Sequence, residues 1–291
     1  MERVLSLLST DPTQLHLLFR PVGGLWKTAA AQLEANYHSV QVLLLTSTNS
    51  MSVTKETAGQ KEVFEKPNQY TLDLSIEISE LDYLMQITNP EPITEKRLKQ
   101  ILNLPSRGSD RSIFKVQKIP EREAEVFDFG GFLRNLQAPF AEVFMWGCSE
   151  YSQEIEEFLR NLIPKRTCFK FTFLFVDLTP TCVDLLLDAW DTWNPRRGRI
   201  EITKCSQKLL TTHISRILDG WCEGRGGRTF RASSCEIPDM DTFWNTFGIE
   251  EPDWKVEPID KTREFHTLTH ERTGTTIQVL YEHGVLKLKC C

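Results

Sequence analysis

Between Phe140 and Cys235 the sequence repeats one pattern four times: a short apolar strand, a polar corner and an amphipathic helix. The unit advances by 30, 27 and 30 residues, with strand segments beginning at Val143, Phe173, Ile200 and Phe230. A period of 20 to 50 residues is typical of repeat proteins in which each unit buries its apolar face only against its neighbours. We therefore expect an α/β fold with these strands side by side and parallel in a curved solenoid, and with the helices on one face.

The helical parts of the pattern are defined by their period. After each corner, apolar residues recur at about i, i+3, i+4 and i+7, which places them on one face of a helix. The four sets are Ile155/Phe158/Leu159/Leu162, Val183/Leu186/Leu187/Trp190, Leu210/Ile214/Ile217/Trp221 and Met240/Phe243/Trp244/Phe247. Thr179-Pro180 is a typical helix start and Gly248 a typical helix end.

The spacing within the units resembles that of the leucine-rich repeat. Phe140-x-x-Val143-x-Met145-x-x-Cys148 fills the template L-x-x-L-x-L-x-x-N/C completely. The other three copies match from the fourth position on, because Lys170, Arg197 and Gly227 stand at the opening leucine. Cysteine recurs at the last template position in three copies, and we expect these thiols to be buried and unpaired: Cys148, Cys205 and Cys235.

The first 45 residues predict a compact helical unit. Three short amphipathic segments are separated by Asp11-Pro12 and by residues 21–24, which hold Pro21 and Gly24. Three helices this short cannot bury their own apolar faces. Some of these side chains are therefore expected to meet another surface, either in this chain or in a partner.

This segment resembles the shortened F-box at the start of many nematode F-box proteins. The resemblance rests on Met1-Glu-Arg-Val4, the leucine-rich second helix, residues 25–31 (Leu-Trp-Lys-Thr-Ala-Ala-Ala) and the strand that follows at residues 40–45. Those proteins also carry degenerate strand–helix repeats toward the C-terminus. The family's start contains Val-Pro or Leu-Pro, whereas this chain has Val4-Leu5.

The resemblance implies a role in protein degradation. In that family the F-box docks on the Skp adaptor of an SCF-type cullin–RING ubiquitin ligase, and the repeats hold a target protein for ubiquitination. Transferred to this sequence, the adaptor would be bound through Val4, Leu5, Leu15, Leu18 and Trp26.

The rest of the chain divides by composition and period. Residues 46–68 are polar and predict an exposed linker or loop. Residues 69–139 are expected to cap the repeats, with strands at 70–78 and 113–119 and helices at 93–104 and 129–136. The four repeats occupy 140–253. Residues 254–291 predict a C-terminal cap, in which a β-hairpin turns at Gly284 after a strand at 264–269.

Composition disfavours a nucleic-acid or membrane partner. The formal net charge is −6 and basic residues are scattered along the chain, so no cationic surface for nucleic acid is indicated. No apolar run approaches the ~20 residues that a membrane span needs. We expect a protein of the cytoplasm, and of the nucleus as a second compartment.

Motifs for catalysis or metal binding are weak. His266 and His270 lie four residues apart but lack the glutamate of H-E-x-x-H and sit in a strand pattern. The basic, glycine-rich segment at 224–228 lacks the lysine and serine of a phosphate-binding loop and fits a return loop. We therefore expect a non-catalytic protein without cofactor or metal.

A binding surface is predicted on the face of the strands that points away from the helices. Side chains alternate along a strand, so the residues between the apolar ones point outward. This set is Trp146, Leu174, Val176, Glu201, Thr203, Arg231 and Ser233.

Three functions follow as hypotheses. The first is a ligase substrate receptor that binds the adaptor and an unidentified target protein. The second is a repeat protein that binds or sequesters a partner without engaging the ligase, and the third is a hydrolase whose site lies in a deep polar pocket.

Overall fold

The structure is a computed structural model, and it describes the following parts of the chain. These are residues 24–25, 28, 38–57, 60–64, 71–80, 89–104, 106, 110–119, 127–192, 198–205, 207–222, 229–233, 237, 240–247, 264–269, 276–282 and 285–290. The predicted adaptor-binding residues Val4, Leu5, Leu15, Leu18 and Trp26 lie outside this set. The predicted bounds 1–45 of the helical unit are too long, because residues 38–45 form a β-strand, β1 (His38–Leu45). For the residues before it, the helical unit stays a prediction.

The chain divides into two compact units, residues 1–144 and 145–291, and both are mixed α/β structures. In the first unit three parallel strands lie next to one another: β6 (Ile113–Gln117), β4 (Thr71–Ser79) and β1 (His38–Leu45). Beyond β1 follow two antiparallel strands, β2 (Ser50–Thr57) and β3 (Gln60–Val63), and the short β5 (Glu91–Pro92) pairs with β2.

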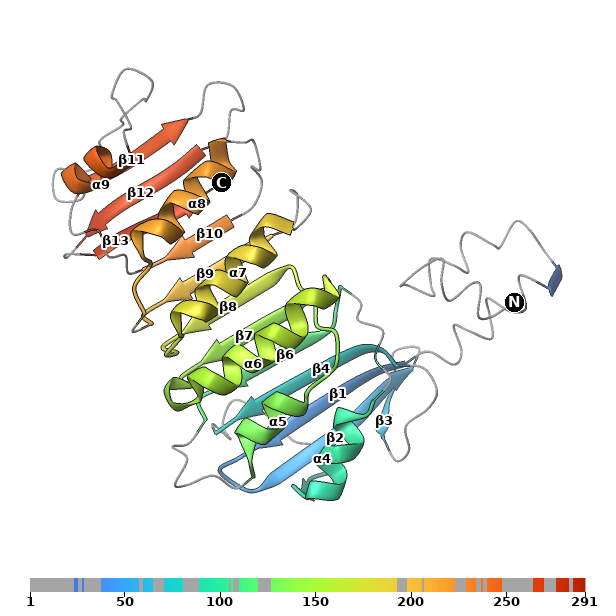
Figure 1. The fold of residues 1–291 in the computed structure, drawn as a ribbon. Helices are drawn as coiled ribbons and strands as arrows, with labels where there is room; N and C mark the ends of the chain where they lie inside the picture. The colour runs from blue at the N-terminus through green and yellow to red at the C-terminus, as the bar shows by residue number, and fades with distance from the viewer. Residues whose placement is uncertain are drawn as a thin grey trace. The chain divides into compact units, whose positions relative to one another are not determined.

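One face of this sheet holds the core of the first unit. Alternate side chains are buried, among them Val42 and Leu44 of β1, Ile76 of β4 and Phe114 of β6. The helices α4 (Glu95–Leu102) and α5 (Phe129–Asn135) lie over that face (Figure 1). The strands and helices predicted for residues 70–136 are thus confirmed, with end points shifted by a few residues.

The prediction of an exposed linker at residues 46–68 is wrong, because β2 and β3 lie in this segment. Met51 and Val53 are buried, and the Phe64 N–H donates to the Val53 carbonyl at 2.9 Å. The strand β2 lies beside β1, and it contributes only these two apolar side chains to the core. The serines and threonines that suggested a linker are compatible with a strand whose other face is polar.

In the second unit β8 (Lys170–Leu174), β9 (Arg199–Thr203) and β10 (Thr229–Ala232) are parallel. β7 (Glu142–Trp146), whose last residues belong to this unit, lies beside β8. On the other side β10 pairs antiparallel with β13 (Val285–Cys290), followed by β12 (Thr276–Glu282) and β11 (Glu264–Thr269). The predicted C-terminal hairpin and the strand at 264–269 are confirmed.

The helices of the second unit match the predicted periods. They are α6 (Ser152–Leu162), α7 (Pro180–Thr192), α8 (Thr211–Cys222) and α9 (Met240–Phe247). α6, α7 and α8 lie side by side over one face of the strands (Figure 1). All four residues of the first predicted apolar set and all four of the second are buried. Within the described residues, no helix is both long and apolar enough to cross a membrane.

The predicted register of the second repeat is wrong by two residues. The strand β8 begins at Lys170, and its buried residues are Phe171 and Phe173, so Phe173 corresponds to Met145 and not to Val143. Phe175, predicted to point inward, is 46% exposed. The corrected strand positions are Val143, Phe171, Ile200 and Phe230, a spacing of 28 to 30 residues.

The cause of the shift is a tight turn directly after the strand. Phe175 has a φ of 53°, and the equivalent residues of the neighbouring copies also have positive φ: Gly147 at 67° and Lys204 at 53°. In the first unit Lys118 after β6 has a φ of 52°. Such a residue leaves the extended conformation, so the alternation of side chains ends there and the next residue turns back toward the core.

The turn is fastened to the next strand by hydrogen bonds. The Gly147 N–H donates to the Leu174 carbonyl at 3.0 Å, and the Phe175 N–H donates to the Thr203 carbonyl at 3.2 Å. The Lys204 N–H donates to Ser233 Oγ at 2.6 Å. Each strand segment is therefore held to the next one beyond the end of their regular pairing.

Truncation of Phe173 and of Phe175 distinguishes the observed register of the second repeat from the predicted one. We expect Phe173→Ala to lower the free energy of unfolding by about 3–5 kcal/mol, because the side chain is fully buried. Phe175→Gly should cost less than about 1 kcal/mol or stabilise, since glycine accepts a positive φ without strain. Urea unfolding of both variants measures the difference, and a larger loss for Phe175→Gly would restore the original register.

Thiol reactivity tests the burial of the corner cysteines. Cys148 and Cys205 are buried free thiols, as predicted, and so are Cys168 and Cys182, whereas Cys235 lies outside the described residues. Burial raises the pKa of Cys205, and thiolate is the reactive form. We expect iodoacetamide at pH 8 to leave Cys148 and Cys205 unmodified in the native chain and to modify both in urea. Rapid native modification of either, read by mass spectrometry, would contradict the burial.

Candidate functional site

The predicted binding residues occupy the strand face that points away from α6, α7 and α8. Trp146, Leu174, Thr203 and Ser233 are half-buried there, each next to a buried neighbour of the same strand segment. Glu201 and Arg231 lie on the same face, where β9 and β10 pair. We call these six residues, together with Thr172 of β8, the open face.

Val176 does not belong to this face. Its side chain is fully buried. The prediction assumed that alternation continued to residue 176, but the positive φ of Phe175 interrupts it and returns Val176 to the core. Val176 therefore contributes to stability and cannot contact a ligand from the open face.

Two arginines and one glutamate form a charged cluster on the open face. Glu201 accepts hydrogen bonds from Arg199 Nη2 at 2.7 Å and from Arg231 Nη1 at 3.2 Å. Its side chain is only 15% exposed, whereas both arginines are about half exposed. One carboxylate balances two guanidinium groups, so the cluster keeps a net positive charge and N–H donors that suit an acidic partner.

A second feature stands at the end of the strands, which we call the strand-end patch: Trp146, Leu174, Phe175 and Lys204. The Lys204 Nζ lies 4.9 Å from the centre of the Phe175 ring, a cation–π distance. A bulky residue with positive φ is strained, and such strain often accompanies function. An exposed aromatic side chain beside a cation is a typical anchor for a protein partner.

Phe175 and Lys204 were missed as site residues in the sequence. The signal that could have identified Phe175 is its equivalence to Gly147 in the first copy, because glycine at a corner often marks a positive φ. An aromatic residue in such a position cannot continue the strand. The competing apolar spacing at 171, 173 and 175 concealed this equivalence.

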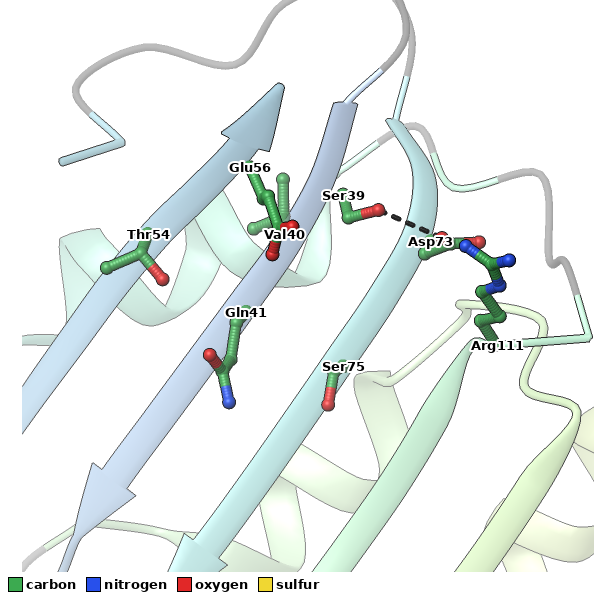
Figure 2. Close-up of a pocket in the computed structure, with 8 residues that line it drawn as sticks. All are labelled: Ser39, Val40, Gln41, Thr54, Glu56, Asp73, Ser75 and Arg111. Atoms are coloured by element: carbon green, nitrogen blue, oxygen red, sulfur yellow. Dashed lines mark hydrogen bonds between the residues drawn. The ribbon is translucent and has the colours of Figure 1, made fainter. Parts of the chain in front are cut away.

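The first unit contains a polar cavity of about 270 Å³ (Figure 2). Its lining consists of Ser39, Val40, Gln41, Thr54, Glu56, Asp73, Ser75 and Arg111. Ser39 Oγ donates directly to Asp73 Oδ2 at 2.9 Å. A serine nucleophile needs a base such as histidine between itself and the acid, and the lining of this cavity holds no imidazole.

Two groups of polar side chains in the second unit, around Thr179 and around His213, cap the starts of helices. Thr179 Oγ1 accepts from the Cys182 N–H at the start of α7 and donates to Glu156 Oε2 of α6 at 2.6 Å. This hydrogen bond, together with that from Arg160, holds the pKa of Glu156 below its ordinary value. His213 Nδ1 accepts from the Leu210 N–H at the start of α8. In the part of the chain that the structure describes, no group of three or more His, Cys, Asp or Glu side chains could hold a metal ion.

No protein-family model, curated protein or solved structure matches this chain.

The charged cluster is expected to stabilise the sheet in a salt-dependent way. Glu201→Gln leaves Arg199 and Arg231 without their shared carboxylate. At low salt we expect a loss of about 0.5–1 kcal/mol in the free energy of unfolding, and a smaller loss in 1 M NaCl, where screening acts over about 3 Å. Glu157→Gln, at an exposed position of α6, is the matched control. Equal losses at both salt concentrations would show that the effect is not electrostatic.

Proposed function

We propose that this chain is the substrate-receptor subunit of an SCF-type cullin–RING ubiquitin ligase. Residues 1–45 dock on the Skp adaptor, and the strand–helix units of residues 140–253 form a leucine-rich-repeat-like solenoid that holds a target protein. The proposal joins two parts with different support, and each can fail separately. The adaptor part rests on the resemblance of residues 1–45 to a shortened F-box.

The target-binding part is supported by one observation above others, the strand-end patch, which shares Trp146 and Leu174 with the open face. Phe175 is nearly half exposed although its neighbours Phe173 and Val176 are fully buried. Exposure of a large aromatic residue in a strained backbone position brings no folding advantage. It is accounted for when Phe175 anchors a partner, with Lys204 beside it.

The charge of the open face narrows the class of target. Arg199 and Arg231 share Glu201 and present the remaining guanidinium donors at the surface. A target segment that combines acidic side chains with one apolar anchor would complement this face. The whole chain has a formal net charge of −6. The positive charge of the open face is therefore a local feature and not a property of the whole surface.

The alternative is a binding protein that does not engage the ligase. The observation that favours it is Val4-Leu5 at the place where the F-box start carries a proline-containing dipeptide. In that case the repeats would bind or sequester the same target, and residues 1–45 would have another role.

The adaptor part is tested with purified components. We expect wild-type chain to co-purify with a recombinant Skp adaptor at micromolar concentration, and Leu18→Ala combined with Trp26→Ala to abolish this. Loss of a well-packed aromatic anchor costs about 2 kcal/mol or more, which is about a thirtyfold loss of affinity. Thermal unfolding of the variant should be nearly unchanged.

Two outcomes would contradict the adaptor part. If the wild-type chain does not bind the adaptor, the ligase function is rejected and the alternative takes its place. If the double variant unfolds the chain, Leu18 and Trp26 belong to a core. For the target part, partners captured from cell extract by the wild type should be depleted about tenfold with Phe175→Ala and retained with Glu157→Gln. Equal capture by both variants would reject the strand-end patch.

A further inference from the structure

The polar cavity of the first unit arises from the order of long and short side chains across three neighbouring strands. Ser39 of β1 lies directly opposite Glu56 of β2, and on its other side the Ser39 hydroxyl donates a hydrogen bond to Asp73 of β4. Neighbouring strands are about 4.8 Å apart, so β2 and β4 are separated by about 10 Å. The short serine between two acidic residues leaves the space that the cavity occupies (Figure 2).

A second row of side chains completes the cavity with uncharged polar groups. Gln41 of β1 lies opposite Thr54 of β2 and is also in register with Ser75 of β4. Figure 2 shows these three side chains next to one another along the same face. Their hydroxyl and amide groups can accept hydrogen bonds from a ligand that donates several N–H groups.

The charges of the cavity favour a cation. Glu56 is exposed, and Lys61 of β3 lies directly opposite it in the β2–β3 register. Asp73 is only 6% exposed, and the Arg111 side chain points toward it (Figure 2). Among the residues that line the cavity, one arginine against two carboxylates leaves a net negative charge, and Glu56 is the exposed carboxylate of the two.

We propose that this cavity binds a guanidinium or alkylammonium group, with Glu56 as the charged partner and Ser39, Gln41 and Thr54 as hydrogen-bond partners. A volume of about 270 Å³ lies just below the range of about 300–1,000 Å³ for pockets that enclose drug-sized molecules. The cavity therefore suits one basic side chain and not a larger cofactor. The proposal does not depend on the ligase function, because none of the residues proposed to bind the adaptor lines this cavity.

The test uses the full-length chain and N-acetyl-L-arginine amide as the probe, with N-acetyl-L-citrulline amide as the neutral analogue of the same shape. Ligand-observed NMR titration should show saturable binding of the arginine compound, at least about fivefold tighter than that of the citrulline compound. Glu56→Gln should weaken arginine binding by about fivefold, the effect of one partly exposed charge pair. The control is Glu62→Gln, whose carboxylate pairs with Lys55 on the same hairpin at 2.9 Å and does not line the cavity.

The same titration separates the two sources of a basic group. A Gly-Ser-Arg-Ser-Gly peptide that binds more tightly than the free amide would assign the cavity to an extended protein segment, whereas equal affinity would assign it to small amines. Absence of saturable arginine binding would overturn the proposal. So would equal binding of arginine and citrulline, equal weakening by Glu56→Gln and Glu62→Gln, or preferential binding of N-acetyl-L-glutamate amide.

Discussion

Both units depend on the burial of alternate apolar side chains of parallel strands beneath helices. In β9, Ile200 and Ile202 are fully or almost fully buried, while Glu201 between them faces outward. Burial of each large aliphatic side chain contributes about 1.5–3 kcal/mol, so the strand cannot slip by one residue without exposing its whole apolar set. This alternation fixes which residues stabilise the fold and which remain available for binding.

The turn after each strand sets the limit of that alternation. A positive φ at Gly147, Phe175 and Lys204 ends the strand, and the following residue of each copy is buried again at Cys148, Val176 and Cys205. A glycine accepts this conformation without cost, whereas the other two residues are strained. Hydrogen bonds to the next strand compensate for part of that strain. The position is thus structurally required, but its side chain is free to serve another purpose.

The sequence identified the elements better than their juxtapositions. α6 and α7 were predictable because their apolar residues repeat at the helical period over three turns. The register of β8 was not, because Phe171, Phe173 and Phe175 fit the strand period equally well and only the backbone at residue 175 decides between them. The strand β2 was missed because few of its residues are apolar.

Of the candidate sites, one was predicted from the sequence and the other was not. The outward positions of β9 and β10 followed from alternation alone, and Glu201 and Arg231 were found in this way. The cavity could not be predicted, since Ser39, Glu56 and Asp73 are far apart in the sequence and meet only through strand pairing. In both places hydrogen bonds join side chains of neighbouring strands. One surface is cationic and the other anionic, so the two units would recognise different groups.

The central claim is that one strand-and-turn unit recurs, with its turn bonded to the next strand. Amide hydrogen exchange of the intact chain tests this most directly. The account predicts that the amides of Gly147, Phe175 and Lys204 are protected as strongly as those inside β8 and β9, because each donates to the neighbouring strand segment. Exchange of these three amides at the rate of unprotected backbone, while the interior of β8 stays protected, would contradict it.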